Sequence, residues 1–185
     1  SGVAMVITLT VPLRKAFGLE AYLTTKHYDA MAKLCLLTSM IVFYAYLSEF
    51  FMAWYSGEEV ERATFWARLF GQYWWATWIM LVCNGMVPVM LWFKRVRYSI
   101  PALFAISIFV NIGMWFERYV IIVTSLHHEY EPFAWGLYRP SVVEMGIVVG
   151  SFCWFGFWFL LFTRLLPPVA IAELKEVLPT PMRPR

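Results

Sequence analysis

The chain has 185 residues, of which 61% are hydrophobic and 19% aromatic, and only 15% carry a charge. Soluble domains are usually about 25% charged, and a water-soluble fold of this length could not bury so much apolar surface. The composition therefore excludes an ordinary soluble domain and predicts an integral membrane protein. The formal net charge of +3 says little by itself. The placement of the charges along the chain is more informative.

The first segment, residues 1–13 (SGVAMVITLTVPL), is apolar but too short to cross a membrane, because a spanning helix needs about 20 residues. It has no basic n-region and no small-residue cleavage site, so it does not resemble a signal peptide. We expect it to be the end of a transmembrane helix. The chain would then be the C-terminal part of a larger protein or a sequence that begins within a helix. Residues 14–29 would follow as a cytoplasmic loop.

Four later segments are each long and apolar enough to form a transmembrane helix. They cover residues 30–55, 72–93, 100–125 and 141–166. Short segments of alternating polarity, which are typical of membrane barrels, do not occur. We therefore predict an all-α integral membrane fold in which residues 30–166 form a four-helix transmembrane bundle. Residues 167–185 would be a cytoplasmic tail, forming a short amphipathic turn or helix.

The Lys and Arg residues are distributed unequally between the two sides of the predicted membrane. Arg118 is the exception, because it lies inside a predicted span. Three lie on one side: Arg62, Arg68 and Arg139. The others lie on the opposite side: Arg14, Lys15, Lys26, Lys33, Lys94, Arg95, Arg97, Arg164, Lys175, Arg183 and Arg185. Since cytoplasmic loops carry the excess of basic residues, this asymmetry predicts a cytoplasmic C-terminus and places residues 56–71 and 126–140 outside, as loops.

Two local patterns predict the backbone geometry of the spans. In "CNGMVP" the residues Asn84, Gly85 and Pro88 fall in mid-span, so we expect a kink or loosened turn with freed carbonyl groups. In "RPSVVEMG" Ser141 precedes an apolar run and Glu144 follows three residues later, which is the pattern of a capping box. Glu144 is therefore interpreted as a helix-start residue rather than as a functional acid.

Three ionisable residues lie within spans: Glu49, Glu117 and Arg118. A charge near mid-bilayer costs roughly 2.5–3.5 kcal/mol on insertion scales, so such groups normally face other helices or a wet cavity. Adjacent helical residues point about 100° apart, so Glu117 and Arg118 should each find a partner on another helix. An ion pair between Arg118 and Glu49 is geometrically allowed. The charged residues either hold the bundle together or serve a proton path or a quinone contact, and the sequence leaves both interpretations open.

The cysteines and histidines do not form the clusters that metal or haem sites need. Cys35, Cys83 and Cys153 each lie alone in an apolar run, without a CxxC or CxxCH motif. The histidines lie in loops or at span ends. We therefore expect no haem, iron–sulfur cluster or metal to be ligated by this chain. His127 and His128 are either exposed loop residues or proton shuttles at the outer mouth.

Three strings carry a resemblance to a known family. They are "SEFFMAWYSG" (48–57), "MWFERYVIIVTSLHHEYEPFAW" (114–135) and "RLLPPVAIAELKEVLP" (164–179). They resemble the C-terminal part of an NrfD/polysulfide-reductase-type membrane subunit, and most closely the larger such subunit of bacterial alternative complex III. The order of spans and loops is similar as well, so the resemblance extends over essentially the whole chain.

This resemblance implies a membrane subunit of a respiratory or photosynthetic quinol:electron-acceptor oxidoreductase in the bacterial inner membrane. It implies a periplasmic iron–sulfur subunit, multihaem cytochrome c subunits and a sister NrfD-like subunit as partners, besides membrane lipid, and no nucleic acid. Quinol (menaquinol or ubiquinol) would be oxidised at the periplasmic side, in a pocket that belongs mainly to a preceding bundle. The residues of this chain are then better candidates for a proton path: Glu49, Glu117 and Arg118 first, and Tyr46, Asn84 and His128 second.

Two other functions remain open at this point. A secondary transporter would suit the Asn-Gly…Pro pattern and the buried charges, although no inverted repeat is detectable. A passive membrane anchor of a redox complex would need neither a proton path nor a quinol contact.

Overall fold

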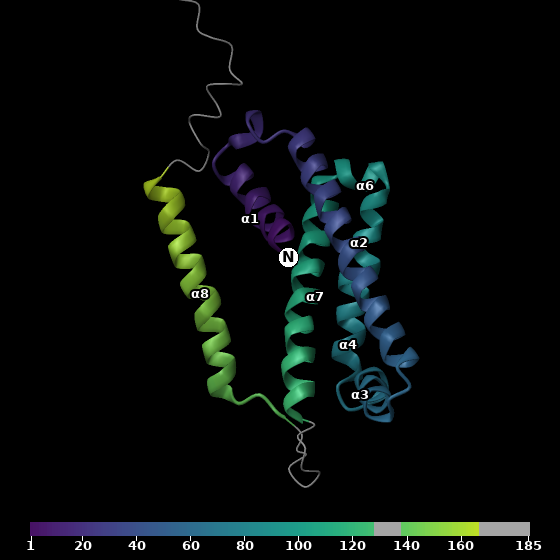
Figure 1. Ribbon diagram of the computed structural model, residues 1–185. Coiled ribbons are helices and arrows are strands. Elements are labelled where there is room, and N and C mark those ends of the chain that lie inside the picture. Colours follow the sequence, from purple (N-terminus) through teal and green to yellow (C-terminus); the bar gives the residue numbers. More distant parts are fainter. Residues whose placement is uncertain (128–137, 167–185) are drawn as a thin grey trace, which may run out of the picture. The chain divides into compact units, whose positions relative to one another are not determined.

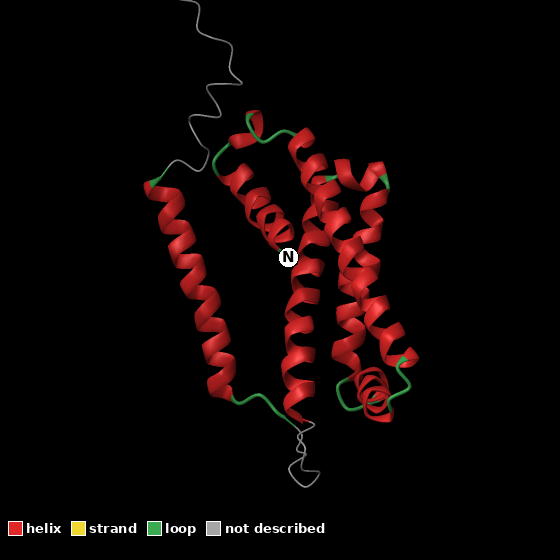
Figure 2. Ribbon diagram, in the orientation of Figure 1, coloured by secondary structure: helices red, strands yellow, loops and turns green. Residues whose placement is uncertain are grey.

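The computed structural model describes residues 1–127 and 138–166, and every regular element in these ranges is helical (Figures 1 and 2). The predicted all-α membrane fold is thereby confirmed. The elements are α1 (Gly2–Ala16), η1 (Leu19–Ala21), α2 (Thr25–Tyr55), α3 (Glu59–Phe70), α4 (Trp74–Leu81), η2 (Val82–Met86), α5 (Val87–Val89), η3 (Met90–Trp92), α6 (Lys94–Tyr98), α7 (Ile100–His127) and α8 (Val142–Leu165).

Four helical stretches among the described residues are long and apolar enough to cross a membrane. They are Thr25–Tyr55, Trp74–Trp92, Ile100–Thr124 and Val142–Leu165, in agreement with the four predicted spans. The helix α1 has 15 residues and so measures about 22 Å, which is less than the hydrocarbon thickness of a bilayer. The predicted tail, residues 167–185, lies outside the described residues.

The second span is a composite of four short elements rather than one regular helix. Between α4 and α5, residues Val82–Met86 form a π-helical turn that contains Asn84 and Gly85. Pro88 follows directly, and its missing N–H and its ring are incompatible with a regular bond to the carbonyl of Asn84. The π turn absorbs this conflict within the membrane, so the predicted loosening of the helix near Asn84 is confirmed.

The segment 59–70, which we expected to be loop, is the helix α3. It begins with acidic residues, Glu59 and Glu61, and ends with Arg68, the order that the helix dipole favours. Gly57, with a φ of 74°, lets the chain turn between α2 and α3. In Figure 2 α3 is seen end-on, so it runs across the end of the bundle as an interfacial helix does.

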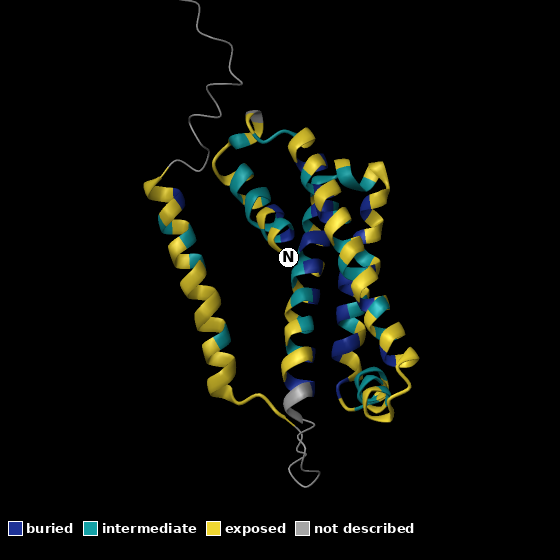
Figure 3. Ribbon diagram, viewed as in Figure 1, coloured by how far each residue is buried: buried dark blue, intermediate teal, exposed yellow. Residues whose placement is uncertain are grey.

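The helices α1, α2, α7 and the composite span pack against one another within residues 1–136 (Figure 3). Small residues at the contacts let the backbones approach closely, as is usual between membrane helices. Examples are Ala4 on α1, Ala32 and Cys35 on α2, and Ala76 on α4, all of them buried. The apolar core also includes Leu103, which is almost fully buried on α7.

The helix α8 belongs to a second unit of the chain, residues 137–185. Its N-terminus has the predicted capping box: Ser141 Oγ accepts from the Glu144 N–H at 3.3 Å, and Glu144 accepts from the Ser141 N–H at 2.7 Å. Tyr138 also donates to the Glu144 carboxylate at 2.8 Å. The interpretation of Glu144 as a helix-start residue is confirmed.

Candidate functional site

A polar site lies between three helices of the first unit and unites three residues that the sequence predicted separately. The Tyr46 hydroxyl, from α2, donates to Oε2 of Glu117, from α7, at 2.7 Å. Nδ2 of Asn84, from the π turn, lies 3.1 Å from the Tyr46 oxygen and 3.4 Å from the same carboxylate oxygen. The carboxylate of Glu117 therefore has two neutral hydrogen-bond donors.

The position of Asn84 depends on the π turn and on a glycine opposite it. A Cβ atom added to Gly113 on α7 would lie 2.7 Å from Cβ of Cys83 and 2.9 Å from Cγ of Asn84, too close for any side chain. Gly113 thus provides the space into which the π turn projects. On the other side of the turn, Gly85 packs against the ring of Phe43 in the same way.

Burial and charge make Glu117 the chemically distinctive member of the site. Tyr46 and Asn84 are only 8% and 2% exposed, and Glu117 is half-buried. Among the ion pairs of the described residues none includes Glu117. The two hydrogen bonds to the Glu117 carboxylate therefore come from an uncharged hydroxyl and an uncharged amide, and no cation pairs with it among the described residues.

A small cavity borders the site. It measures about 40 Å³ and is bounded by Asn84, by Thr38 and Ser39 of α2, and by Val110 and Met114 of α7. This volume suffices for a water molecule, which needs at least about 10–15 Å³ and polar partners. Ser1 and Val42 also bound the cavity, and Asn84 is the residue of the polar site that lines it.

The other two charged candidates lie elsewhere than expected. Glu49 pairs with Arg68 of α3, whose Nη1 lies 3.4 Å from Oε1 of Glu49, and not with Arg118. The Glu49–Arg118 pair that the sequence allowed is therefore not formed among the described residues: Glu49 meets the helix α3, a segment that the sequence analysis took for a loop. Arg118 is exposed and takes no part in the ion pairs of residues 1–127 and 138–166.

Two polar clusters were missed by the sequence analysis. Thr8 of α1 lies 2.9 Å from the Ser107 hydroxyl and accepts from Nδ2 of Asn111 at 3.0 Å. Ser107 and Asn111 are four residues apart on one span, so they share a helix face, and that spacing was a usable signal. At the α6 end, Arg97 donates to Asp29 at 2.8 Å and to the carbonyls of Leu91 and Trp92, both at 3.0 Å.

Within the described part of the chain there is no group of three or more His, Cys, Asp or Glu residues that could hold a metal ion. His128 lies outside the described residues. Its proposed role as a proton shuttle is therefore neither supported nor opposed by the geometry.

Comparison with known proteins adds a family match. Residues 1–128, more than half of the chain, match the model of a family described as "Polysulphide reductase, NrfD". This range contains the three residues of the polar site. No curated protein matches the sequence.

Proposed function

The chain belongs to the NrfD family, whose members are membrane subunits of quinol-linked oxidoreductases, and on this premise we propose that it serves a complex of the alternative complex III type. Family members assemble with iron–sulfur and other redox subunits. For this chain we propose a periplasmic iron–sulfur subunit, multihaem cytochrome c subunits and a sister membrane subunit as partners. The resemblance of three sequence strings to the larger subunit of that complex supports the choice.

The proposed orientation places the α3 end of the bundle at the periplasmic side of a bacterial inner membrane, with the C-terminus in the cytoplasm. The support is the excess of Lys and Arg at the opposite end, since basic residues concentrate in cytoplasmic loops. Quinol would be oxidised near the periplasmic side, in a pocket formed mainly outside this segment. We assign no quinol-binding residue to this chain.

The role proposed for this chain is to conduct protons through the polar site of Tyr46, Asn84 and Glu117. The observation that carries it is the Glu117 carboxylate, which accepts hydrogen bonds from two neutral side chains on two other helices. A carboxylate that only stabilises the fold commonly sits in an ion pair, as Asp29 does with Arg97 near the cytoplasmic end of α2, whereas Glu117 has no ion pair among the described residues. Quinol oxidation releases protons as well as electrons, and a protonatable site with a water-sized cavity beside it suits their transfer.

The test is Glu117→Gln in the full-length protein, assembled with its partner subunits and reconstituted in sealed vesicles. Gln keeps the size and the hydrogen bonds of Glu but cannot exchange a proton. We expect proton release coupled to quinol oxidation to fall by about 10²-fold or more while assembly and the electron-carrier spectra are unchanged. Glu49→Gln is the matched control, because Glu49 already has an ion-pair partner on α3.

The alternative function, a passive membrane anchor, makes the opposite prediction. If Glu117→Gln retains both turnover and proton release, the polar site only holds the helices together and the proposed proton role is refuted. If Glu49→Gln is the variant that loses proton release, the path runs through the Glu49–Arg68 pair instead.

A further inference from the structure

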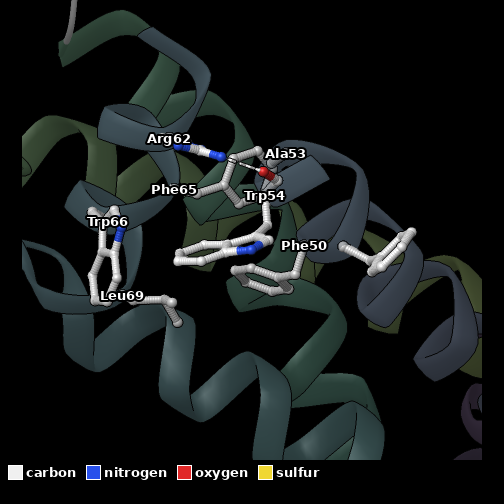
Figure 4. Close-up of a pocket in the computed structure, with 8 residues that line it drawn as sticks. Phe50, Ala53, Trp54, Arg62, Phe65, Trp66 and Leu69 are labelled. Carbon is white, nitrogen blue, oxygen red and sulfur yellow. Dashed lines mark hydrogen bonds between the residues drawn. The ribbon is translucent and has the colours of Figure 1, made fainter. Parts of the chain in front are cut away.

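A groove separates the last turns of α2 from the helix α3 (Figure 4). Its volume is about 320 Å³, at the lower end of the range of small-molecule sites. The walls are carbon-rich and are formed by Phe50, Ala53, Trp54, Phe65, Trp66 and Leu69. Phe50 and Phe65 meet edge to face with ring centroids 5.2 Å apart, so the floor of the groove is a packed aromatic surface.

The groove lies at the level where a membrane meets water. Its tryptophans share the α3 end of the bundle with Trp74, Trp75 and Trp78, and tryptophan concentrates at membrane interfaces. Trp54 and Trp66 are both more than half exposed. Water in such a groove would face mostly carbon, whereas the surrounding bilayer supplies hydrocarbon chains at this depth.

One cation lies at the rim. The guanidinium of Arg62 donates from Nε and Nη2 to the Trp54 carbonyl, at 3.3 and 2.8 Å, and lies over the Trp54 ring at 5.2 Å (Figure 4). These contacts hold it in place. Arg62 takes part in no ion pair of the described residues, and the neighbouring Glu61 instead accepts a hydrogen bond from Ser56 at 2.8 Å. The guanidinium of Arg62 is therefore oriented at the rim without a direct ion pair among the described residues, while Glu58, Glu59 and Glu61 lie within about one helical turn of it.

We propose that this groove binds a phospholipid, with the phosphate diester on Arg62 and one acyl chain against Phe65, Trp66 and Leu69. The charge complementarity between a phosphate and a guanidinium that has no ion-pair partner among the described residues, next to an apolar groove at interfacial depth, selects this occupant. The bound lipid would fasten α3 to the end of α2. The inference is independent of the proton role of Glu117 and of the orientation of the bundle.

The experiment uses the full-length protein with the subunits that it retains, stripped of lipid in detergent. The protein is then titrated with phosphatidylglycerol and, separately, with diacylglycerol of the same acyl chains, and bound lipid is counted by native mass spectrometry. We expect one tightly held phosphatidylglycerol, and diacylglycerol bound at least about tenfold more weakly because it lacks the phosphate. Arg62→Gln should weaken phosphatidylglycerol by the same factor.

Arg139→Gln is the matched control, because it removes the same charge from an exposed arginine that does not line the groove. It should leave the tight binding unchanged. Trp66→Ala removes an exposed aromatic side chain that lines the groove. It serves as the second variant if the Arg62→Gln protein fails to assemble, and we expect it to bind phosphatidylglycerol more weakly than the wild type does. The proposal is overturned if diacylglycerol binds equally well, if neither groove variant weakens binding, or if a quinone or a protein segment occupies the groove in place of the phospholipid.

Discussion

Gly113→Ala tests how the polar site is built. The added Cβ would meet Cβ of Cys83 at 2.7 Å and Cγ of Asn84 at 2.9 Å, and its shortest contact would be with Oδ1 of Asn84. Asn84 is 2% exposed and hydrogen-bonded to Tyr46 and Glu117, so it has little room to move aside. The substitution must therefore push the π turn away from α7 or break the contacts of Asn84.

The magnitude follows from two opposing terms. Overpacking a close helix contact costs about 1–3 kcal/mol. Replacing glycine by alanine in a helix returns about 0.5–1 kcal/mol, because the unfolded chain loses conformational freedom. We expect a net loss of about 1–2 kcal/mol, which corresponds to a fall of about 2–8 °C in melting temperature for a chain of this size.

A double-mutant cycle with Asn84→Ala identifies the source of the loss. Alanine at position 84 removes both of the Asn84 side-chain atoms that the new Cβ would meet, so the cost of Gly113→Ala should shrink by about 1 kcal/mol in that background. Melting temperatures of the four proteins in detergent provide the measurement, and proton release in vesicles reports on the site. Equal costs in both backgrounds, or a Gly113→Ala protein as stable and active as the wild type, would refute the reasoning.

Two further predictions concern the ends of the helices. Asp29→Asn should lower the free energy of unfolding by about 2 kcal/mol, because it leaves the mostly buried guanidinium of Arg97 without its anion. Lys33→Gln, which removes a side chain that is 60% exposed, should cost less than about 1 kcal/mol, and equal melting temperatures of the two variants would contradict this. Ser141→Ala should lower the free energy of unfolding by about 1 kcal/mol, because it removes the N-cap of α8. Amide hydrogen exchange should become faster in the first turn of α8, including at the N–H of Glu144. Unchanged exchange there would show that the cap is dispensable.

Several features were predictable because they depend on local sequence. The four spans follow from runs of apolar residues, and the capping box of α8 follows from the spacing of Ser141 and Glu144. A kink or loosened turn was predicted from Asn84, Gly85 and Pro88, because proline disrupts the bond to the residue four positions earlier, and the structure shows that it takes the form of a π turn. The helix α3 could have been recognised from its acidic start and basic end, but it was interpreted as a loop because its segment is too polar to span a membrane.

The partners of the buried polar groups were decided only by the tertiary structure. The sequence identified Glu49, Tyr46, Asn84 and Glu117 as polar residues in an apolar environment, and it determined the membrane class and the helical fold. It did not find their partners, and the one pair that it allowed, Glu49 with Arg118, is not formed among the described residues. A pairing depends on how far each helix is rotated about its axis and how deep it lies relative to its neighbours. Packing of α2, α7 and the π turn around Gly113 brings Tyr46 and Asn84 to Glu117, and the crossing of α3 brings Arg68 to Glu49.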